Sequence, residues 1–432
     1  MKQLKLTSLL DYLVRKENLW KSPEKFELLL EELITRMHRF YYDRSSVYRK
    51  LCDLEGVSQT ARVDDLYKVM LIDRVFKSYP TEYPEREPGK FIAWLNKIMT
   101  KPLRVTVTPK RSLQKFLDDL SQYIWLSYSS GTTGRFTFIP RDEQTKEFCI
   151  RSFAEAAVAI SGDYVRNMHF ILALPRKTHL FISWIPKEVA ERISGKVTVL
   201  LNEISADIVR ARTKPPATFS EKVKSSIIGL LGGIMKSKLI KKLYSEVEKA
   251  VAKREEIILF GSMPVMYAFC KKLVERGERL ELPGRSIVVT GGGFKLEKGV
   301  SIEQFNKLLY EALGIPAPER HVDGYGMCEC NILFYSCVEG GEKHVPPWVK
   351  VLLLDEELRP LPEYGRQTGR LAFFDPLAQS YPGFIITGDK VTINWNGCSK
   401  CSREGPVIEK IERIKSEEGR GCALVLGKIL GE

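Results

Sequence analysis

The chain has 432 residues, of which 44% are hydrophobic and 28% are charged. This composition excludes a disordered or fibrous protein, and the length favours two or three domains. The formal net charge of +13 favours acidic partners, but the basic residues are spread along the chain without a nucleic-acid recognition motif, which argues against nucleic acid.

The amino terminus and the cysteine content both favour a cytoplasmic protein. The only apolar run near the start is short and is interrupted by Asp11, Arg15 and Lys16, so no secretory signal is expected. The longest weakly polar stretch, Ser225 to Met235, is about half as long as a transmembrane helix. Nine cysteines, an odd number, favour reduced thiols, metal ligands or chemistry over a disulfide framework.

The first half of the chain has the pattern of an α/β domain. Apolar residues at helical spacing predict one or two amphipathic helices between Ser22 and Leu54. From there to about Val300, short apolar runs alternate with helical stretches, which is typical of a largely parallel sheet. The runs expected as strands are Tyr123–Leu126, His169–Leu174, Val197–Leu201, Ile257–Phe260 and Ser286–Thr290, with a crossover helix over Met263–Arg276 between the last two.

The pattern changes after about Val345, where paired apolar runs are separated by Pro and Gly. This pattern predicts a smaller, mostly antiparallel sheet. Its expected strands are Val349–Leu354, Gly369–Phe374, Phe384–Thr387 and Lys390–Ile393.

The basic stretch from Lys222 to Lys249 surrounds the apolar segment Ser225 to Met235. An amphipathic helix pair here would contact an anionic membrane peripherally or cover a hydrophobic substrate channel. An ordinary solvated helix with one buried face is the favoured interpretation.

A loop rich in hydroxyls and glycines follows the run that ends near Leu126. Glycine lets backbone amides approach phosphate oxygens closely, and Ser and Thr add donors without bulk. The loop is not a Walker A motif, because Arg135 stands where the lysine would be. A flexible surface turn is the alternative to a polyphosphate site. The residues concerned are Ser129, Ser130, Gly131, Thr132, Thr133 and Gly134.

This loop resembles the phosphate-binding motif of the adenylate-forming superfamily, which includes acyl-CoA synthetases, luciferases and nonribosomal-peptide adenylation domains. Further motifs of that superfamily follow in the same order. The resemblance implies a fold with mixed, mainly parallel sheets flanked by helices, a small β-rich subdomain, and ATP and Mg²⁺ as cofactors.

The resemblance also implies roles for individual residues. Val288-Val289-Thr290 leads into Gly291, Gly292 and Gly293, which resemble the adenine-side loop. In the segment DGYGMCE, Tyr325 would lie against adenine beside Gly326, and Glu329 would help to hold magnesium; Cys328 replaces the usual threonine. Asp389, in Thr387-Gly388-Asp389, would accept hydrogen bonds from both ribose hydroxyls, and Arg413 matches the hinge arginine that reaches the ribose.

Only 43 residues follow Asp389, too few for the usual separate lid domain, so a truncated C-terminal lid is expected. Together with the segments GGGFK, HVPPW, DPLAQSYPGFIITGD and RGCALVL, this resembles the LuxE-type acyl-protein synthetases from about Phe40 onward. We expect a large adenylate-forming domain over residues 1–388, with its β-rich portion at about 345–388, and a short C-terminal segment over residues 389–432.

The resemblance implies that a fatty acid is adenylated, passed to an enzyme cysteine and then transferred to an acyl-CoA-reductase-type partner. Cys422 stands at the matching position, next to Arg420, whose cation would lower the thiol pKa. The alternative for Cys422 is a small buried apolar residue. Lys295, in GGGFK, would contact the carboxylate or a phosphate, or is an ordinary surface lysine.

Cys398 and Cys401 form a Cys-x-x-Cys pair, which is half of a zinc site. The other half would come from Cys330, Cys337 or His344.

The sequence therefore predicts a ligase that activates a carboxylic acid, with a fatty acid favoured, as its acyl-adenylate and then acylates its own cysteine. The alternatives are an acyl- or aryl-CoA ligase resembling phenylacetate-CoA ligases and a noncatalytic nucleotide-binding subunit. The basic charge also fits an acidic acyl carrier as partner.

Overall fold

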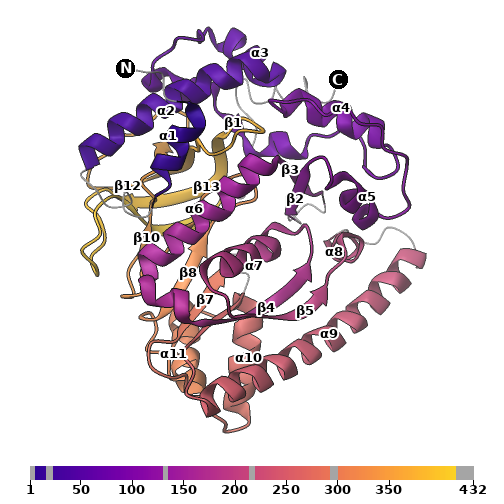
Figure 1. The fold of residues 1–432 in the computed structure, drawn as a ribbon, viewed down its shortest axis with the longest axis vertical. Helices are drawn as coiled ribbons and strands as arrows, with labels where there is room; N and C mark the ends of the chain where they lie inside the picture. Colours follow the sequence, from indigo (N-terminus) through magenta and orange to yellow (C-terminus); the bar gives the residue numbers. More distant parts are fainter. Residues whose placement is uncertain (1–4, 16–22, 130–134, 214–218, 292–299, 415–432) are drawn as a thin grey trace.

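The computed structural model describes residues 5–15, 23–129, 135–213, 219–291 and 300–414 (Figure 1). It begins with the helices α1 (Leu6–Leu13), α2 (Pro23–Arg44) and α3 (Ser46–Glu55). The last two confirm the amphipathic helices predicted for this region. α3 starts where Ser45 caps the Tyr48 amide and ends at Gly56, whose φ of 64° suits glycine.

A six-stranded sheet in the order β5-β4-β6-β7-β8-β9 forms the centre of the molecule. All its pairings are parallel except that of β8 with β9, which confirms the predicted largely parallel sheet. The strands are β4 (His169–Lys177), β5 (Val197–Glu203), β6 (Ile257–Ser262), β7 (Ile287–Gly291), β8 (His321–Tyr325) and β9 (Phe334–Tyr335).

Helices cover both faces of this sheet, and alternate strand residues point into two different apolar clusters. Ile258 and Ile287 lie in the cluster that includes α6 (Glu143–Ser161) and α7 (Phe181–Ile193), whereas their neighbours Leu259 and Val288 face the cluster of α9, α10 and α11. Burial on both faces explains why these strands are continuous apolar runs. The second set of helices is α9 (Phe219–Ala252), α10 (Met263–Glu275) and α11 (Ile302–Leu313).

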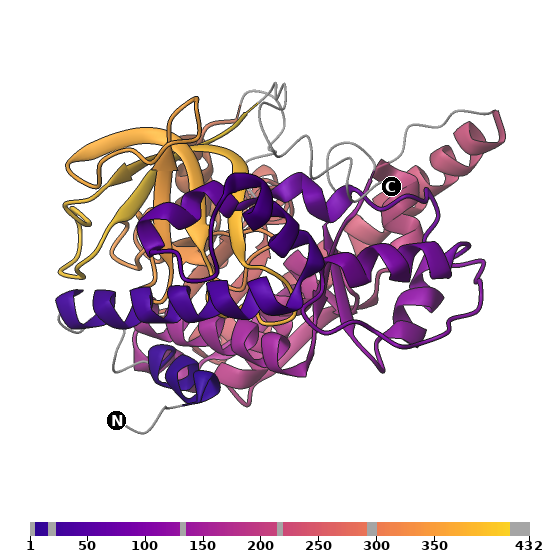
Figure 2. The same cartoon turned by 90° about the horizontal axis from the view of Figure 1, so that it is seen from above.

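The second large sheet is mostly antiparallel and has the order β10-β14-β13-β12-β11 (Figure 2, yellow). Its strands are β10 (Lys343–His344), β11 (Lys350–Leu354), β12 (Arg366–Phe374), β13 (Phe384–Asn394) and β14 (Val407–Arg413). One short strand from the N-terminal region, β1 (Leu71–Ile72), pairs parallel with β13. Residue 388, where the boundary between the large domain and the C-terminal segment is expected, lies within β13. The position of this boundary stays a prediction.

The extent predicted for one strand region was wrong. The runs Phe384–Thr387 and Lys390–Ile393 belong to the single strand β13, because Asp389 between them pairs with Arg413 of β14, although the ladder with β12 shifts its register opposite this segment. The basic stretch forms one helix of 34 residues, α9, in which Leu243 and Val247 are buried, so the favoured interpretation of a helix with one buried face is confirmed and the helix pair is not observed. Its Gly232-Gly233 step lowers helix propensity by about 1 kcal/mol per glycine, which the rest of a long helix tolerates.

No helix in the described part of the chain combines the length and the apolar character that crossing a bilayer requires. The remaining described helices and strands lie between α3 and α9. They are η2 (Val63–Val69), η3 (Asp73–Lys77), α4 (Pro88–Ile98), α5 (Leu113–Leu120), β2 (Trp125–Ser129), β3 (Thr137–Arg141), η4 (Asp163–Asn167) and α8 (Ala206–Thr213).

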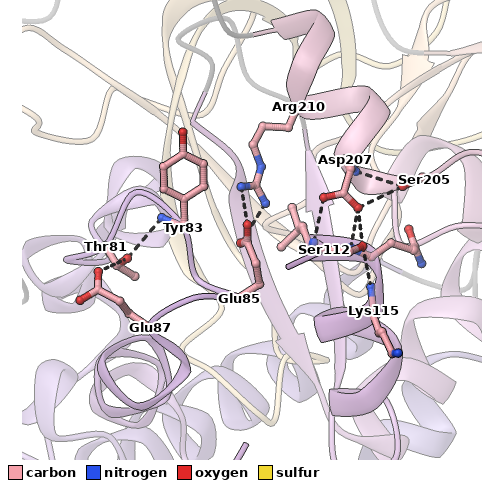
Figure 3. Close-up of polar contacts among 11 residues, drawn as sticks. Thr81, Tyr83, Glu85, Glu87, Ser112, Lys115, Ser205, Asp207 and Arg210 are labelled. Atoms are coloured by element: carbon pink, nitrogen blue, oxygen red, sulfur yellow. Dashed lines mark hydrogen bonds and ion pairs between the residues drawn. The ribbon is translucent and has the colours of Figure 1, made fainter. Parts of the chain in front are cut away.

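Polar contacts attach α8 to the segment that precedes β2 (Figure 3). Asp207 accepts hydrogen bonds from the Ser112 hydroxyl (2.7 Å) and the Leu113 amide (2.8 Å), so α8 caps the start of α5. One turn later Arg210 forms a two-pronged ion pair with Glu85, at 2.9 and 3.0 Å. The Glu85 side chain is only 3% exposed, so this pair is held out of water.

We expect Glu85→Ala to lower the free energy of unfolding by about 3 kcal/mol, because it leaves the Arg210 guanidinium largely buried without its carboxylate. Urea denaturation measures the change. Glu311→Ala is the matched control, since it breaks an exposed ion pair with Lys307 on α11 and should cost less than about 1 kcal/mol. Equal losses in the two variants would contradict this assignment.

Candidate active site

Three predicted site residues from different strands meet in one cluster. Tyr325, the last residue of β8, donates a hydrogen bond from Oη to Asp389 Oδ2 at 2.8 Å. Arg413, the last residue of β14, donates from Nη1 to Asp389 Oδ1 at 3.1 Å. Asp389 and Arg413 are direct cross-strand partners in β13 and β14. The Asp389 carboxylate is therefore held from two sides and joins the central sheet to the antiparallel sheet.

Two glycines of the motifs leave space that this cluster needs. A Cβ atom on Gly388 would lie 2.9 Å from the Arg413 guanidinium, and one on Gly326 would overlap the Leu333 side chain. A larger residue at position 388 would push Arg413 away from Asp389. The glycines on either side of this cluster are therefore required by close approach of side chains.

A second acidic residue, Asp73, lies beside Arg413 and was not predicted. It begins η3 and is 5% exposed, and its Oδ2 lies 3.5 Å from Arg413 Nη2. Among the described residues, its buried Oδ1 atom has no hydrogen-bond partner. Asp73 precedes Arg413 by 340 residues, and no motif marks it, so only the fold brings it to the site.

Glu329 is buried near Asp73. Burial raises its pKa to about 7, with a further contribution from the negative charge of Asp73, while Lys77 and Arg413 oppose the shift. Two neighbouring carboxyl groups, one with an unpartnered oxygen, form an all-oxygen donor set of the kind that Mg²⁺ prefers. The residues present therefore fit a magnesium ion.

A buried polar network fixes the loop that carries Glu329. Arg141, at the end of β3, donates to the carbonyl oxygens of Cys328 (2.7 Å) and Cys330 (3.0 Å) and to the Asn331 side chain (2.8 Å). The amide groups of Asn331 in turn bind the buried carboxylate of Asp375, at 2.8 and 2.9 Å. The carbonyl oxygens of Cys328 and Cys330, on either side of Glu329, thus find donors inside the protein, which restrains the backbone of the loop.

The described flanks of the predicted phosphate loop form the paired strands β2 and β3, with Ser129 opposite Thr137. Ser129 is half-buried at the end of β2. Arg135 follows the loop, and its guanidinium carbon lies 4.2 Å from the centre of the Tyr79 ring. The rest of the loop lies outside the described residues, namely Ser130, Gly131, Thr132, Thr133 and Gly134.

Some of the other predicted residues are described by the structure, and some lie outside the described part of the chain. Gly291 ends β7 opposite Gly324 of β8, so its strand finishes at the same edge of the sheet as Tyr325. The carboxyl edge of a parallel sheet is where α/β proteins bind ligands. Four predicted residues lie outside the described part of the chain: Gly292, Gly293, Lys295 and Cys422.

Two of the three residues considered as further zinc ligands lie close to Cys398 and Cys401. Ligand atoms of Cys337, His344, Cys398 and Cys401 all lie within 4.8 Å of one another. Cys330 does not join them, because its thiol bonds the carbonyl oxygens of Met327 and Ile332 in the Glu329 loop.

Comparison with known families relates the C-terminal part of the chain to one family. Residues 235–431 match the family described as acyl-protein synthetase, LuxE. Two curated relatives are both named long-chain-fatty-acid–luciferin-component ligase. The Vibrio harveyi protein is 32% identical over 176 residues, which cover 40% of this chain and 45% of the relative. The Aliivibrio fischeri protein is 29% identical over 185 residues, which cover 41% of this chain and 47% of the relative. The chain thus spans about half the length of these relatives.

Solved structures of adenylate-forming ligases share the fold over most of the chain. An open conformation of 2-hydroxyisobutyryl-CoA ligase with 2-HIB-AMP and CoA has a TM-score of 0.54 at 14% identity, covering 88% of this chain and 72% of the ligase. The same ligase in its thioesterification state has a TM-score of 0.58 at 15% identity, and the match covers 92% of this chain and 70% of the ligase. The predicted α/β fold of the adenylate-forming ligases is therefore confirmed.

We expect the stability of the protein, without divalent ions, to fall between about pH 4.5 and pH 7 through Glu329. Its pKa is raised from 4.5 to about 7 on folding, so the unfolded chain releases this proton first. The stability that neutral Glu329 contributes is complete below pH 4.5 and is lost as the pH rises through 7. Glu329→Gln should remove this loss, and urea denaturation of both proteins across this range measures it. Parallel stability curves would refute the shift.

Proposed function

We propose that this chain, whose residues 235–431 match the LuxE acyl-protein synthetase family, activates a carboxylic acid as its acyl-adenylate and passes the acyl group to Cys422. The observation that carries the proposal is the Asp389 carboxylate held between Tyr325 and Arg413. A fixed carboxylate beside an aromatic ring suits a nucleoside, because it accepts hydrogen bonds from ribose hydroxyls while the ring contacts the base.

The second part of the site suits the polyphosphate. The Ser129–Gly134 loop follows β2, and Arg135 lies just after it. Asp73 and Glu329 would hold Mg²⁺, which when bound neutralises charge on the phosphates. The Arg413 guanidinium lies beside Asp73 and adds positive charge at the same place. The residues that bind the nucleoside and those that bind the phosphates would thus be neighbours.

Adenylation makes the chemistry feasible by giving the acid a good leaving group. A carboxylate oxygen of the substrate attacks the α-phosphorus of ATP, forming an acyl-AMP and releasing pyrophosphate. The Cys422 thiolate then attacks the acyl carbon, a thioester forms, and AMP leaves. A protein partner of the acyl-CoA-reductase type would accept the acyl group from Cys422. The names of the curated relatives support a long-chain fatty acid as the substrate.

Intact mass spectrometry tests the acylation step. After incubation with ATP, Mg²⁺ and a panel of fatty and aromatic acids, we expect one acyl adduct that hydroxylamine removes and that Cys422→Ser lacks. Cys270→Ser, which changes a buried thiol in α10, should keep the adduct. AMP formation without an adduct, and a CoA ester once coenzyme A is added, would support a CoA ligase instead.

The nucleotide role of Asp389 has its own test. We expect Asp389→Ala to raise the Kd for AMP at least about tenfold, because a hydrogen bond to a charged group contributes roughly 1.5–3 kcal/mol. Titration calorimetry measures the change. Glu412→Ala is the control, because Glu412 is exposed on the partner strand β14, next to Arg413, and forms an ion pair with Lys410. Unchanged AMP affinity in Asp389→Ala would overturn the assignment.

A further inference from the structure

Four potential metal ligands come from two separate segments of the chain. Cys337 follows β9 and His344 ends β10, whereas Cys398 and Cys401 lie between β13 and β14. The pairing of β10 with β14, in which His344 lies opposite Val407, brings the two segments together. The proximity of these side chains is therefore fixed by the ladder.

The distances suit a tetrahedral ion. Zinc bonds of about 2.0–2.3 Å place neighbouring ligand atoms about 3.3–3.8 Å apart. Cys337 Sγ lies 3.8 Å from Cys398 Sγ, and Cys401 Sγ lies 3.4 Å from His344 Nε2. The two sulfurs are much too far apart for a disulfide, whose bond is about 2.05 Å, and all eight cysteines of the described residues are free thiols.

The surroundings place hydrogen-bond donors beside the sulfur atoms. The Gly341 amide donates to Cys337 Sγ at 3.1 Å, and the Lys400 amide donates to Cys398 Sγ at 3.4 Å. A side chain at Gly341 would overlap both sulfurs, so the backbone must approach them closely. Arg403 is a cation near Cys401, and it is held by an ion pair with Glu339 at 2.8 Å. Amide donors and a nearby cation are the kind of outer contacts that orient and stabilise metal ligands.

We propose that Cys337, His344, Cys398 and Cys401 bind one structural Zn²⁺ ion. Three thiolates and one imidazole make a closed, four-coordinate set, which leaves no position for a substrate. The ion would tie the β9–β10 segment to the β13–β14 connection. β9 pairs with β8, which carries Tyr325, and β14 carries Arg413, so the metal would hold together the two sheets that build the nucleotide site. That consequence rests on the proposed function, whereas zinc binding does not.

Metal analysis of the purified full chain by inductively coupled plasma mass spectrometry tests the site. We expect about one zinc per chain in the wild type. Cys398→Ser and Cys401→Ser should each lose most of this zinc or all of it. Cys270→Ala, which removes a buried thiol of α10, should keep its zinc. Zinc retained in both Cys-x-x-Cys variants, or stoichiometric iron in place of zinc, would overturn the proposal.

A second measurement uses the wild type alone, so that the test does not depend on whether the variants fold. After removal of metal with a chelator, Co²⁺ should bind in a 1:1 ratio, give the absorption bands of tetrahedral thiolate coordination, and be displaced by Zn²⁺. Metal removal should lower the Tm, and zinc should restore it. A folded protein that gives no such cobalt spectrum would refute the site. Zinc binding without any adenylation would refute only the proposed function.

Discussion

The candidate site depends on the carboxylate of Asp389, which links two sheets that share one apolar cluster but differ in strand direction. Tyr325 reaches it from the end of β8, and Arg413 reaches it from the partner position on β14. Hydrogen bonds to a charged acceptor are stronger than neutral ones, so these contacts help to fix the carboxylate where the two sheets meet. The same geometry leaves the carboxylate able to accept further hydrogen bonds, which is the basis for assigning nucleoside recognition to this point.

Buried charge organises the rest of the site. Arg141 is fully buried, yet its guanidinium bonds the carbonyl oxygens of the loop that carries Glu329, and Asp375 balances the network through Asn331. Leaving any of these groups without its partner would be costly. Glu329 differs, because burial raises its pKa and the like charge of its neighbour Asp73 adds to the shift. The protein thus holds the loop rigid and leaves an acidic position that a divalent cation would stabilise.

Local patterns predicted much of this arrangement. The apolar runs identified β4 to β7, and the order of the motifs identified Tyr325, Asp389 and Arg413. Long-range pairings were not accessible in this way. Nothing local indicates that β1 pairs with β13, and therefore nothing indicated Asp73. The burial of Arg141 was missed for the same reason, since its partners lie almost 190 residues away. The Cys-x-x-Cys pair was found by spacing, but its choice of Cys337 and His344 over Cys330 depends on the pairing of β10 with β14.

The exchange of labelled pyrophosphate into ATP measures whether this site joins a carboxylic acid to AMP. We expect the purified protein to catalyse this exchange with Mg²⁺ only when a suitable carboxylic acid is present, and long-chain fatty acids to support it best. A folded protein that binds ATP but shows no acid-dependent exchange, or that releases ADP and phosphate instead, would show that the site does not form an acyl-adenylate.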